Sequence, residues 1–134
     1  MAREERDYSH RSLIDKLGVK REHRICLRGA LSRTFVDALS AEVEHRPATN
    51  ARGRYDLIFL QVDAPEDLRT IATLAAHLEP AGALWIVHPK GKGASPSDGE
   101  VRAAGLNAGL VDNKISAYTD THTVTRYVIP KARR

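Results

Sequence analysis

The stretch that decides the fold class spans residues 80–92 and reads Pro80-Ala81-Gly82-Ala83-Leu84-Trp85-Ile86-Val87-His88-Pro89-Lys90-Gly91-Lys92. It contains a turn, an apolar run over residues 83–88 and a basic, glycine-rich loop. A short apolar run bounded by Gly and Pro predicts a buried parallel strand, because helices cover both faces of such a sheet. Ligands of open α/β sheets bind at the rim, the edge where the parallel strands end. The residues that end this stretch are therefore predicted to lie at a ligand site.

The composition is that of one ordinary globular domain. The chain has 134 residues, of which 42% are hydrophobic and 28% charged, and this length suits a single core. The formal net charge is +4, but aromatic residues make up only 5% and the basic residues do not gather on one predicted helix. Dedicated nucleic-acid binding is therefore not expected.

The sequence indicates a cytoplasmic protein without a membrane partner. A single cysteine, Cys26, cannot form an internal disulfide, which favours a reducing compartment. No apolar run reaches the roughly 18 residues that span a bilayer. The first residues lack the apolar core of a signal peptide.

Hydrophobic patterning predicts a single domain over residues 1–134, in which strands and helices alternate. Residues 1–10 are expected to be flexible, 12–18 to form a short helical arm capped by Ser12, 24–129 to form the α/β core, and 130–134 to form a basic tail. The expected core elements are strand 24–29, a helix capped by Ser32, strand 55–63, a helix from Asp63 to about Leu78, strand 83–88, helix 98–108, and strands 110–118 and 123–129.

This order predicts a three-layer, Rossmann-like α/β fold with a mostly parallel sheet of about five strands. The run of strand, helix, strand 83–87, helix and terminal hairpin looks like the carboxyl-terminal half of an S-adenosylmethionine-dependent methyltransferase. In that family the last strand inserts antiparallel between its two predecessors. The resemblance therefore implies the strand order 1-2-3-5-4 and a truncated version of the methyltransferase fold.

The sequence also resembles, over nearly its whole length, a bacterial domain-of-unknown-function family, the one numbered thirty fifty-two. The matching residues are Tyr8-Ser9, Lys16-Leu17-Gly18-Val19, Gly82-Ala83-Leu84-Trp85 with Pro89-Lys90, Val101-Arg102, and Gly109-Leu110-Val111-Asp112 with Lys114. His122 stands where that family usually carries a tryptophan. The family has no established activity, so this resemblance supports the fold and leaves the function open.

The methyltransferase resemblance implies a cofactor site, from which this chain departs twice. The family needs a glycine-rich turn after its first strand and an acidic residue at the end of the next strand to hold the ribose hydroxyls. Here the turn has one glycine, Gly29, followed by the bulky Leu31. The next strand is missing or reduced to the neighbourhood of Glu44 and His45. We therefore expect no bound cofactor.

A second candidate site is an anion-binding loop, Lys90-Gly91-Lys92-Gly93-Ala94-Ser95. It combines two ammonium groups, glycines that let backbone amides converge, and the amino end of the helix that follows. The loop does not match a Walker motif. The other interpretation is a solvated loop before a helix that is capped internally by Ser97 and Glu100, and it carries slightly more weight.

The remaining polar residues give weaker signals. Asp63 ends a strand at the same rim and suits a base or a ribose ligand, although a helix cap fits its place better. The histidines, at positions 10, 23, 45, 77, 88 and 122, lack the spacing of metal sites, so no metal is expected. Only His88 and His122 fall near the rim. Cys26 and Trp85 are predicted core residues.

These observations favour a non-catalytic binding module that recognises a small anionic ligand or a protein partner at the rim. The candidate ligand-binding residues are Gly29, Asp63, His88, Lys90, Lys92 and Ser95, and no catalytic residue is assigned. The alternative is an S-adenosylmethionine-dependent methyltransferase or a related small transferase. The cofactor of such an enzyme would occupy the Gly29 turn, whereas the module would leave that turn packed shut by Leu31. Whether the protein is an enzyme stays open, with the balance against catalysis.

Overall fold

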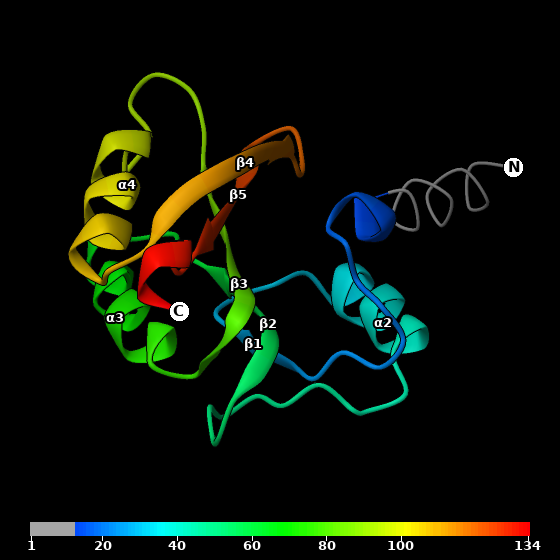
Figure 1. Ribbon diagram of the computed structural model, residues 1–134. Helices are drawn as coiled ribbons and strands as arrows, with labels where there is room; N and C mark the ends of the chain where they lie inside the picture. Colours follow the sequence, from blue (N-terminus) through cyan, green and yellow to red (C-terminus); the bar gives the residue numbers. More distant parts are fainter. Residues whose placement is uncertain (1–12) are drawn as a thin grey trace, which may run out of the picture.

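The computed structural model describes residues 13–134 and shows one mixed sheet between two helical layers (Figure 1). The strands are β1 (Ile25–Arg28), β2 (Tyr55–Gln61), β3 (Leu78–Pro89), β4 (Val111–Ala117) and β5 (His122–Val128). Their order in the sheet is β1-β2-β3-β5-β4. The first three strands are parallel, and β5 lies antiparallel between β3 and β4. The predicted fold class and strand order are confirmed.

Helices cover the two faces of the sheet separately. On one face lie α2 (Arg33–Glu42) and a helical turn at residues 13–16, and on the other lie α3 (Arg69–Ala75) and α4 (Asp98–Asn107). In Figure 1 the sheet separates α2 from the α3 and α4 pair. We call these the α2 face and the α4 face.

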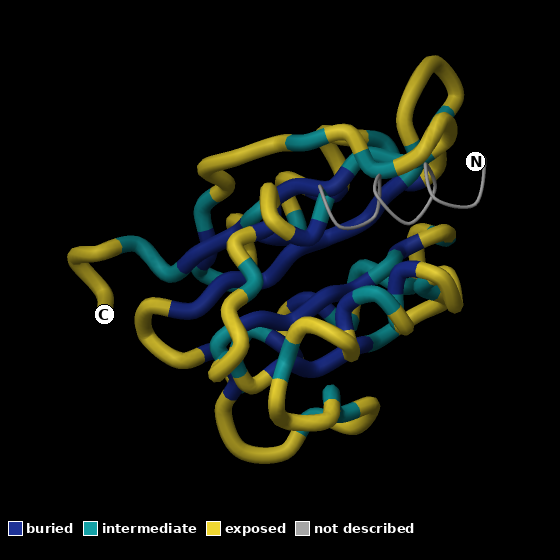
Figure 2. The backbone as a smooth tube through the Cα atoms, turned by 90° about the vertical axis from the view of Figure 1, so that its right-hand side faces the viewer, coloured by how far each residue is buried: buried dark blue, intermediate teal, exposed yellow. Residues whose placement is uncertain are grey.

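The core consists of two apolar layers, one on each face of the sheet. Along β3, Trp85 and Val87 point to the α2 face, whereas Leu84 and Ile86 point to the α4 face. This alternation explains why residues 83–88 form an unbroken apolar run: both faces of a central strand must be apolar when helices cover both. Figure 2 shows the central strands as the buried interior of the molecule, whereas the edge strand β4 is mostly exposed.

Side-chain caps start the two longest helices. Ser32 accepts a hydrogen bond from the backbone N–H of Phe35 at the start of α2. At the start of α4, Ser97 and Glu100 form a reciprocal capping box. Both caps satisfy backbone donors that would otherwise lack partners, and both were predicted from the sequence.

The segment between β2 and β3 differs from the prediction. A single helix was expected from Asp63 to Leu78, but the chain forms a 3-10 turn at Pro65–Leu68 followed by α3, which ends at Ala75. Leu78 already belongs to β3 and pairs with Tyr55. Its apolar side chain continues the helical spacing of the residues before it, so periodicity alone placed it in the helix.

The short strand expected beside β1 lies further along the chain than predicted. Ala48 forms an isolated parallel bridge with Cys26, whereas the sequence placed this strand near Glu44 and His45. The backbone N–H of Glu44 bonds the carbonyl of Arg21, which precedes β1. Because the bridge is parallel, Glu44 lies toward the end of the sheet opposite the rim.

No helix within residues 13–134 is long and apolar enough to cross a membrane. In the same part of the chain, no three His, Cys, Asp or Glu side chains gather closely enough to hold a metal ion. The predicted flexibility of residues 1–10, the Ser12 cap and the Tyr8-Ser9 match lie outside the described residues.

Candidate functional site at the rim

The rim is formed where β1, β2 and β3 end and β5 begins. After β1 the chain turns through Gly29, whose φ is +87°. A Cβ atom at this position would lie 2.3 Å from the carbonyl oxygen of Gln61, at the end of β2. The turn therefore needs glycine for its backbone conformation and for its close approach to β2. Leu31 is half-buried against the apolar layer of the α2 face.

Asp63 and His122 form the tightest polar contact at the rim. Nε2 of His122 lies 2.7 Å from Oδ1 of Asp63. The other carboxylate oxygen of Asp63 accepts a hydrogen bond of 2.9 Å from the side-chain amide of Gln61. On the far side of the imidazole, Nδ1 lies 2.8 Å from the hydroxyl oxygen of Thr121.

This arrangement fixes the proton on the imidazole of His122. A carboxylate only accepts hydrogen bonds, so Nε2 of the neutral ring carries the proton and donates it to Asp63. Nδ1 then accepts from the hydroxyl of Thr121. An imidazole that is oriented by a carboxylate and has an accepting nitrogen facing a hydroxyl is the arrangement that general-base catalysis uses.

Asp63 does not cap the helix that follows it, although the sequence favoured that role. Asp67 takes it instead: one of its carboxylate oxygens accepts hydrogen bonds from the backbone N–H groups of Asp63 and Ala64, at 3.0 and 3.1 Å. The carboxylate of Asp63 is therefore left for His122.

His88 is the penultimate residue of β3, next to the paired Pro89 and His122, but its side chain is buried. The ring turns to the α4 face, where Nε2 lies 2.9 Å from the hydroxyl oxygen of Thr125. Nδ1 lies 3.4 Å from a carboxylate oxygen of Asp98 and makes no hydrogen bond within the described residues. A cavity of 450 Å³ adjoins the ring, between α4 and the β4–β5 pair.

The burial of His88 makes stability depend on pH. Burial lowers the pKa of this imidazole, and the nearby Asp98 opposes the effect less strongly. In the unfolded chain His88 takes up a proton near its ordinary pKa of 6.5, so the unfolded state binds more protons than the native state just below this pH. The contribution of His88 to the free energy of unfolding is therefore complete above about pH 6.5 and is lost as the pH falls through the lower native pKa.

Urea unfolding at about pH 7.5 and about pH 5.5 measures this effect. The wild type is expected to lose more stability between these two pH values than the variant His88→Gln, which has no titrating ring. If both proteins lost the same amount, His88 would not be the group that responds.

The Lys90 loop presents its charges to solvent. Lys90, Lys92 and Ser95 are exposed, and neither ammonium group bonds any other residue among 13–134. The backbone N–H of Lys90 donates to the carbonyl of Thr121, which ties the loop to the turn before β5. Ser97 and Glu100 already provide hydrogen-bond partners for backbone N–H groups at the start of α4, so an anion is not needed there. Anion binding by this loop stays a prediction.

The contact between Asp63 and His122 could not be read from residue spacing, because 59 residues separate them. The register brings them together: Pro89, at the end of β3, pairs with His122, at the start of β5. The expected strand order carried this signal, because an antiparallel strand inserted beside β3 must begin at the rim.

No family model and no curated protein matches this sequence, so the resemblance to the domain-of-unknown-function family stays a prediction. Solved structures with a similar fold include S-adenosylmethionine-dependent methyltransferases. Magnesium protoporphyrin IX methyltransferase from Synechocystis PCC 6803, solved with bound SAH, has a TM-score of 0.69 at 12% identity, covering 93% of this chain and 82% of its own. A TehB-like SAM-dependent methyltransferase from Corynebacterium glutamicum has a TM-score of 0.57 at 14% identity, covering 90% and 86%. At these identities the likeness shows the fold alone.

Proposed function

We propose that the rim binds an adenosyl compound of the S-adenosylmethionine type and that the protein transfers a methyl group from it. The observation that carries the proposal is the chain of contacts from the Gly29 turn, through the end of β2, to the Asp63 and His122 pair. It places a glycine turn and an oriented imidazole on one edge of a sheet whose strand order is that of the methyltransferase-like fold.

The start of α2 suits the charged end of such a ligand. The helix follows the Gly29 turn directly, and its first turn holds no acidic side chain. Its N-terminus therefore carries a partial positive charge that no residue of its own first turn offsets, and a carboxylate binds well in such a place. Ala30 and Ser32 are exposed and leave the approach open.

The ribose end of such a ligand would find no carboxylate. Residues 45–54 contain no Asp or Glu, and Glu44 lies toward the opposite end of the sheet. The carbonyl of Asn50 accepts a hydrogen bond from the hydroxyl of Tyr55, the first residue of β2. The chain therefore turns back toward the start of β2 soon after the Ala48 bridge and brings no carboxylate to the ribose end. Neutral hydrogen bonds, which would have to hold the ribose instead, are about half as strong as charge-assisted ones. We therefore expect weak binding of the adenosyl compound.

His122 would act as the proton acceptor of the reaction. An oxygen or nitrogen nucleophile placed where the hydroxyl of Thr121 lies would give its proton to Nδ1 of His122, and Asp63 would stabilise the imidazolium that forms. The bound sulfonium supplies an activated methyl group. The chain's own contribution is to orient the imidazole and to accept the proton.

The competing proposal is a non-catalytic module that recognises a small anionic ligand or a protein partner at the same rim. Binding of a phosphorylated compound that is lost when Lys90 and Lys92 are both replaced by Ala would favour it. The likeness to methyltransferases favours the enzymatic proposal. The contact between Asp63 and His122 favours it as well, because methyl transfer needs a proton acceptor and simple binding does not.

One variant tests the role of His122. With any phenol or amine acceptor that the wild type methylates, His122→Gln is expected to lower kcat about a hundredfold or more, which is typical when a general base is removed. Its dissociation constant for S-adenosylhomocysteine should not change. An equal loss of binding would assign His122 a structural role instead.

A further inference from the structure

A second cavity lies away from the rim, toward the end of the sheet where β2 and β3 begin. Its volume is 530 Å³. The chain from Lys16 to His23 forms one wall, and the α2 face of the sheet forms the floor. Nothing in the proposed methyl transfer uses it.

Three side chains form a row across the floor of this cavity. Trp85 on β3 is registered with Arg126 on β5, and Arg126 is registered with Lys114 on β4. Registered residues on neighbouring strands project from the same face, with their Cβ atoms about 5 Å apart. Arg126 and Lys114 are therefore like charges in a directly opposed pair, an arrangement that destabilises a sheet.

Neither cation is neutralised by a carboxylate within the described residues. A guanidinium nitrogen of Arg126 donates to the side-chain oxygen of Asn113, at 3.3 Å, and the ammonium of Lys114 donates to the carbonyl of Lys16, at 3.0 Å. Both acceptors are neutral. Burial, with a further contribution from the charge of Arg134, lowers the pKa of Arg126, as expected for a guanidinium held partly out of water without a counter-ion.

The rest of the lining adds to the positive charge. Lys16 and Lys20 bring the cations to four, against the two carboxylates of Asp56 and Glu79. Asp56 already accepts a hydrogen bond from the backbone N–H of Arg24. An excess of positive charge therefore remains in the cavity.

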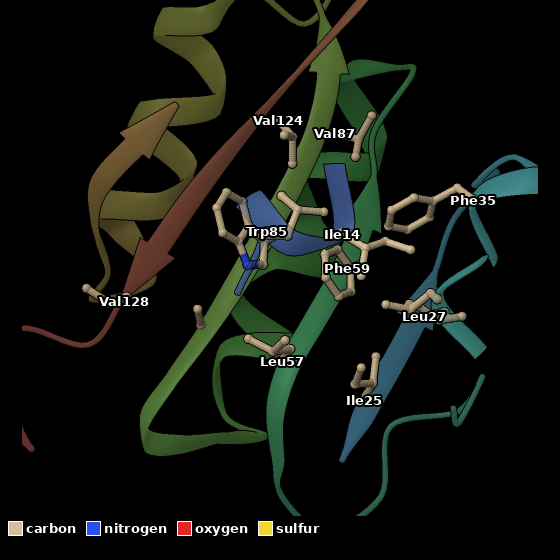
Figure 3. Close-up of a cluster of buried hydrophobic side chains, with 13 residues drawn as sticks. Ile14, Ile25, Leu27, Phe35, Leu57, Phe59, Trp85, Val87, Val124 and Val128 are labelled. Atoms are coloured by element: carbon tan, nitrogen blue, oxygen red, sulfur yellow. The ribbon is translucent and has the colours of Figure 1, made fainter. Parts of the chain in front are cut away.

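Trp85 supplies an unused donor beside these cations. Its side chain is 1% exposed, and its indole Nε1 has no hydrogen-bond partner among residues 13–134. A buried N–H without an acceptor is rare in folded proteins, because it loses its hydration without compensation. Figure 3 shows the ring on the side of the apolar cluster nearest β5, away from Phe35.

We propose that this cavity binds a small organic anion, with its phosphoryl or carboxyl group held between Arg126 and Lys114 and its planar body beside Trp85. The anion offsets the repulsion between the two cations. It also offers an oxygen acceptor to the indole N–H. The apolar lining from Leu17, Leu57 and Ala81 suits an uncharged ring better than a bare inorganic ion.

The single tryptophan of the chain makes the site directly observable. The protein has one indole N–H signal in a ¹⁵N–¹H correlation spectrum, and it comes from Trp85. Phenyl phosphate, benzoate and phenol, each titrated at constant ionic strength, share an aromatic ring and differ in the group attached to it. We expect one or both anions to move this signal in a saturable way and phenol to leave it in place. The anion that binds more tightly identifies the phosphoryl or the carboxyl class.

Charge-matched variants show whether the named residues hold the anion. Arg126→Gln with Lys114→Gln is expected to weaken binding about a hundredfold, because two charge-assisted hydrogen bonds are lost. Arg52→Gln with Arg69→Gln removes the same charge from exposed positions outside the cavity and should bind like the wild type. If the Arg126→Gln and Lys114→Gln double variant fails to fold, the single variant Lys20→Gln takes its place. Lys20 is an exposed residue of the cavity wall, and we expect Lys20→Gln to bind the anion several-fold more weakly than the wild type. The proposal is overturned if neither anion moves the signal, or if the cavity variants bind as tightly as the control pair.

Discussion

Replacing Gly29 with alanine is expected to lower the free energy of unfolding by about 3 kcal/mol or more. Two effects add. The new Cβ atom would lie 2.3 Å from the carbonyl oxygen of Gln61, and this oxygen belongs to the backbone of β2, so it cannot move aside as the end of a flexible side chain could. The φ of +87° is also unfavourable for alanine. Urea unfolding monitored by circular dichroism measures the change.

Gly91→Ala separates the two effects. Gly91 has a φ of +94°, but a Cβ atom at this position would meet nothing within 4 Å. We therefore expect Gly91→Ala to lower the free energy of unfolding only by the cost of the backbone conformation, about 1 kcal/mol. A loss at Gly29 no larger than the loss at Gly91 would show that the turn after β1 does not press against β2.

The second large effect is expected for Phe35→Ala, which should lower the free energy of unfolding by about 4 kcal/mol. The ring is completely buried. It meets Phe59 edge-on at 5.5 Å between centroids and Tyr118 at 5.4 Å. Phe35 thus joins α2, β2 and the turn before β5, as Figure 3 shows in part, and aromatic pairs of this geometry add to the energy of burial.

Val36→Ala is the matched control for Phe35→Ala. Val36 is the next residue on α2 and is only half-buried, so removal of its two methyl groups should lower the stability by about 1 kcal/mol. The ratio of the two losses shows whether α2 is anchored through Phe35. Similar losses would mean that the ring is not the main contact between α2 and the sheet.

Most of the fold could be predicted because the strands carry clear local signals. Residues 57–60 and 83–87 are continuous apolar runs, which buried parallel strands require. Ser97 and Glu100 have the capping-box spacing, and α4 begins where they predict. The boundary before β3 was missed because Leu78 satisfies a helical and a strand pattern equally well.

The site was predicted less well because it depends on contacts between distant parts of the chain. His88 is near the end of β3, which stops at the rim, yet its ring faces α4. The side of a strand to which a residue points cannot be read from an apolar run in which both sides are buried. Asp63 was assigned to the cap because it directly precedes Ala64-Pro65, but Asp67, four residues later, reaches back to the same backbone donors. Arg126 and Lys114 have no local signal at all, since only the register of β4, β5 and β3 places them together.

The measurement that tests the central claim most directly is a calorimetric titration of the purified protein with S-adenosylhomocysteine, repeated on two variants. Ala30→Trp places a large ring over the Gly29 turn, and Ala41→Trp places the same ring near the end of α2, where the side chain is also exposed. The account predicts saturable binding to the wild type and to Ala41→Trp, and none to Ala30→Trp. No binding to the wild type, or undiminished binding to Ala30→Trp, would contradict a ligand site at this rim.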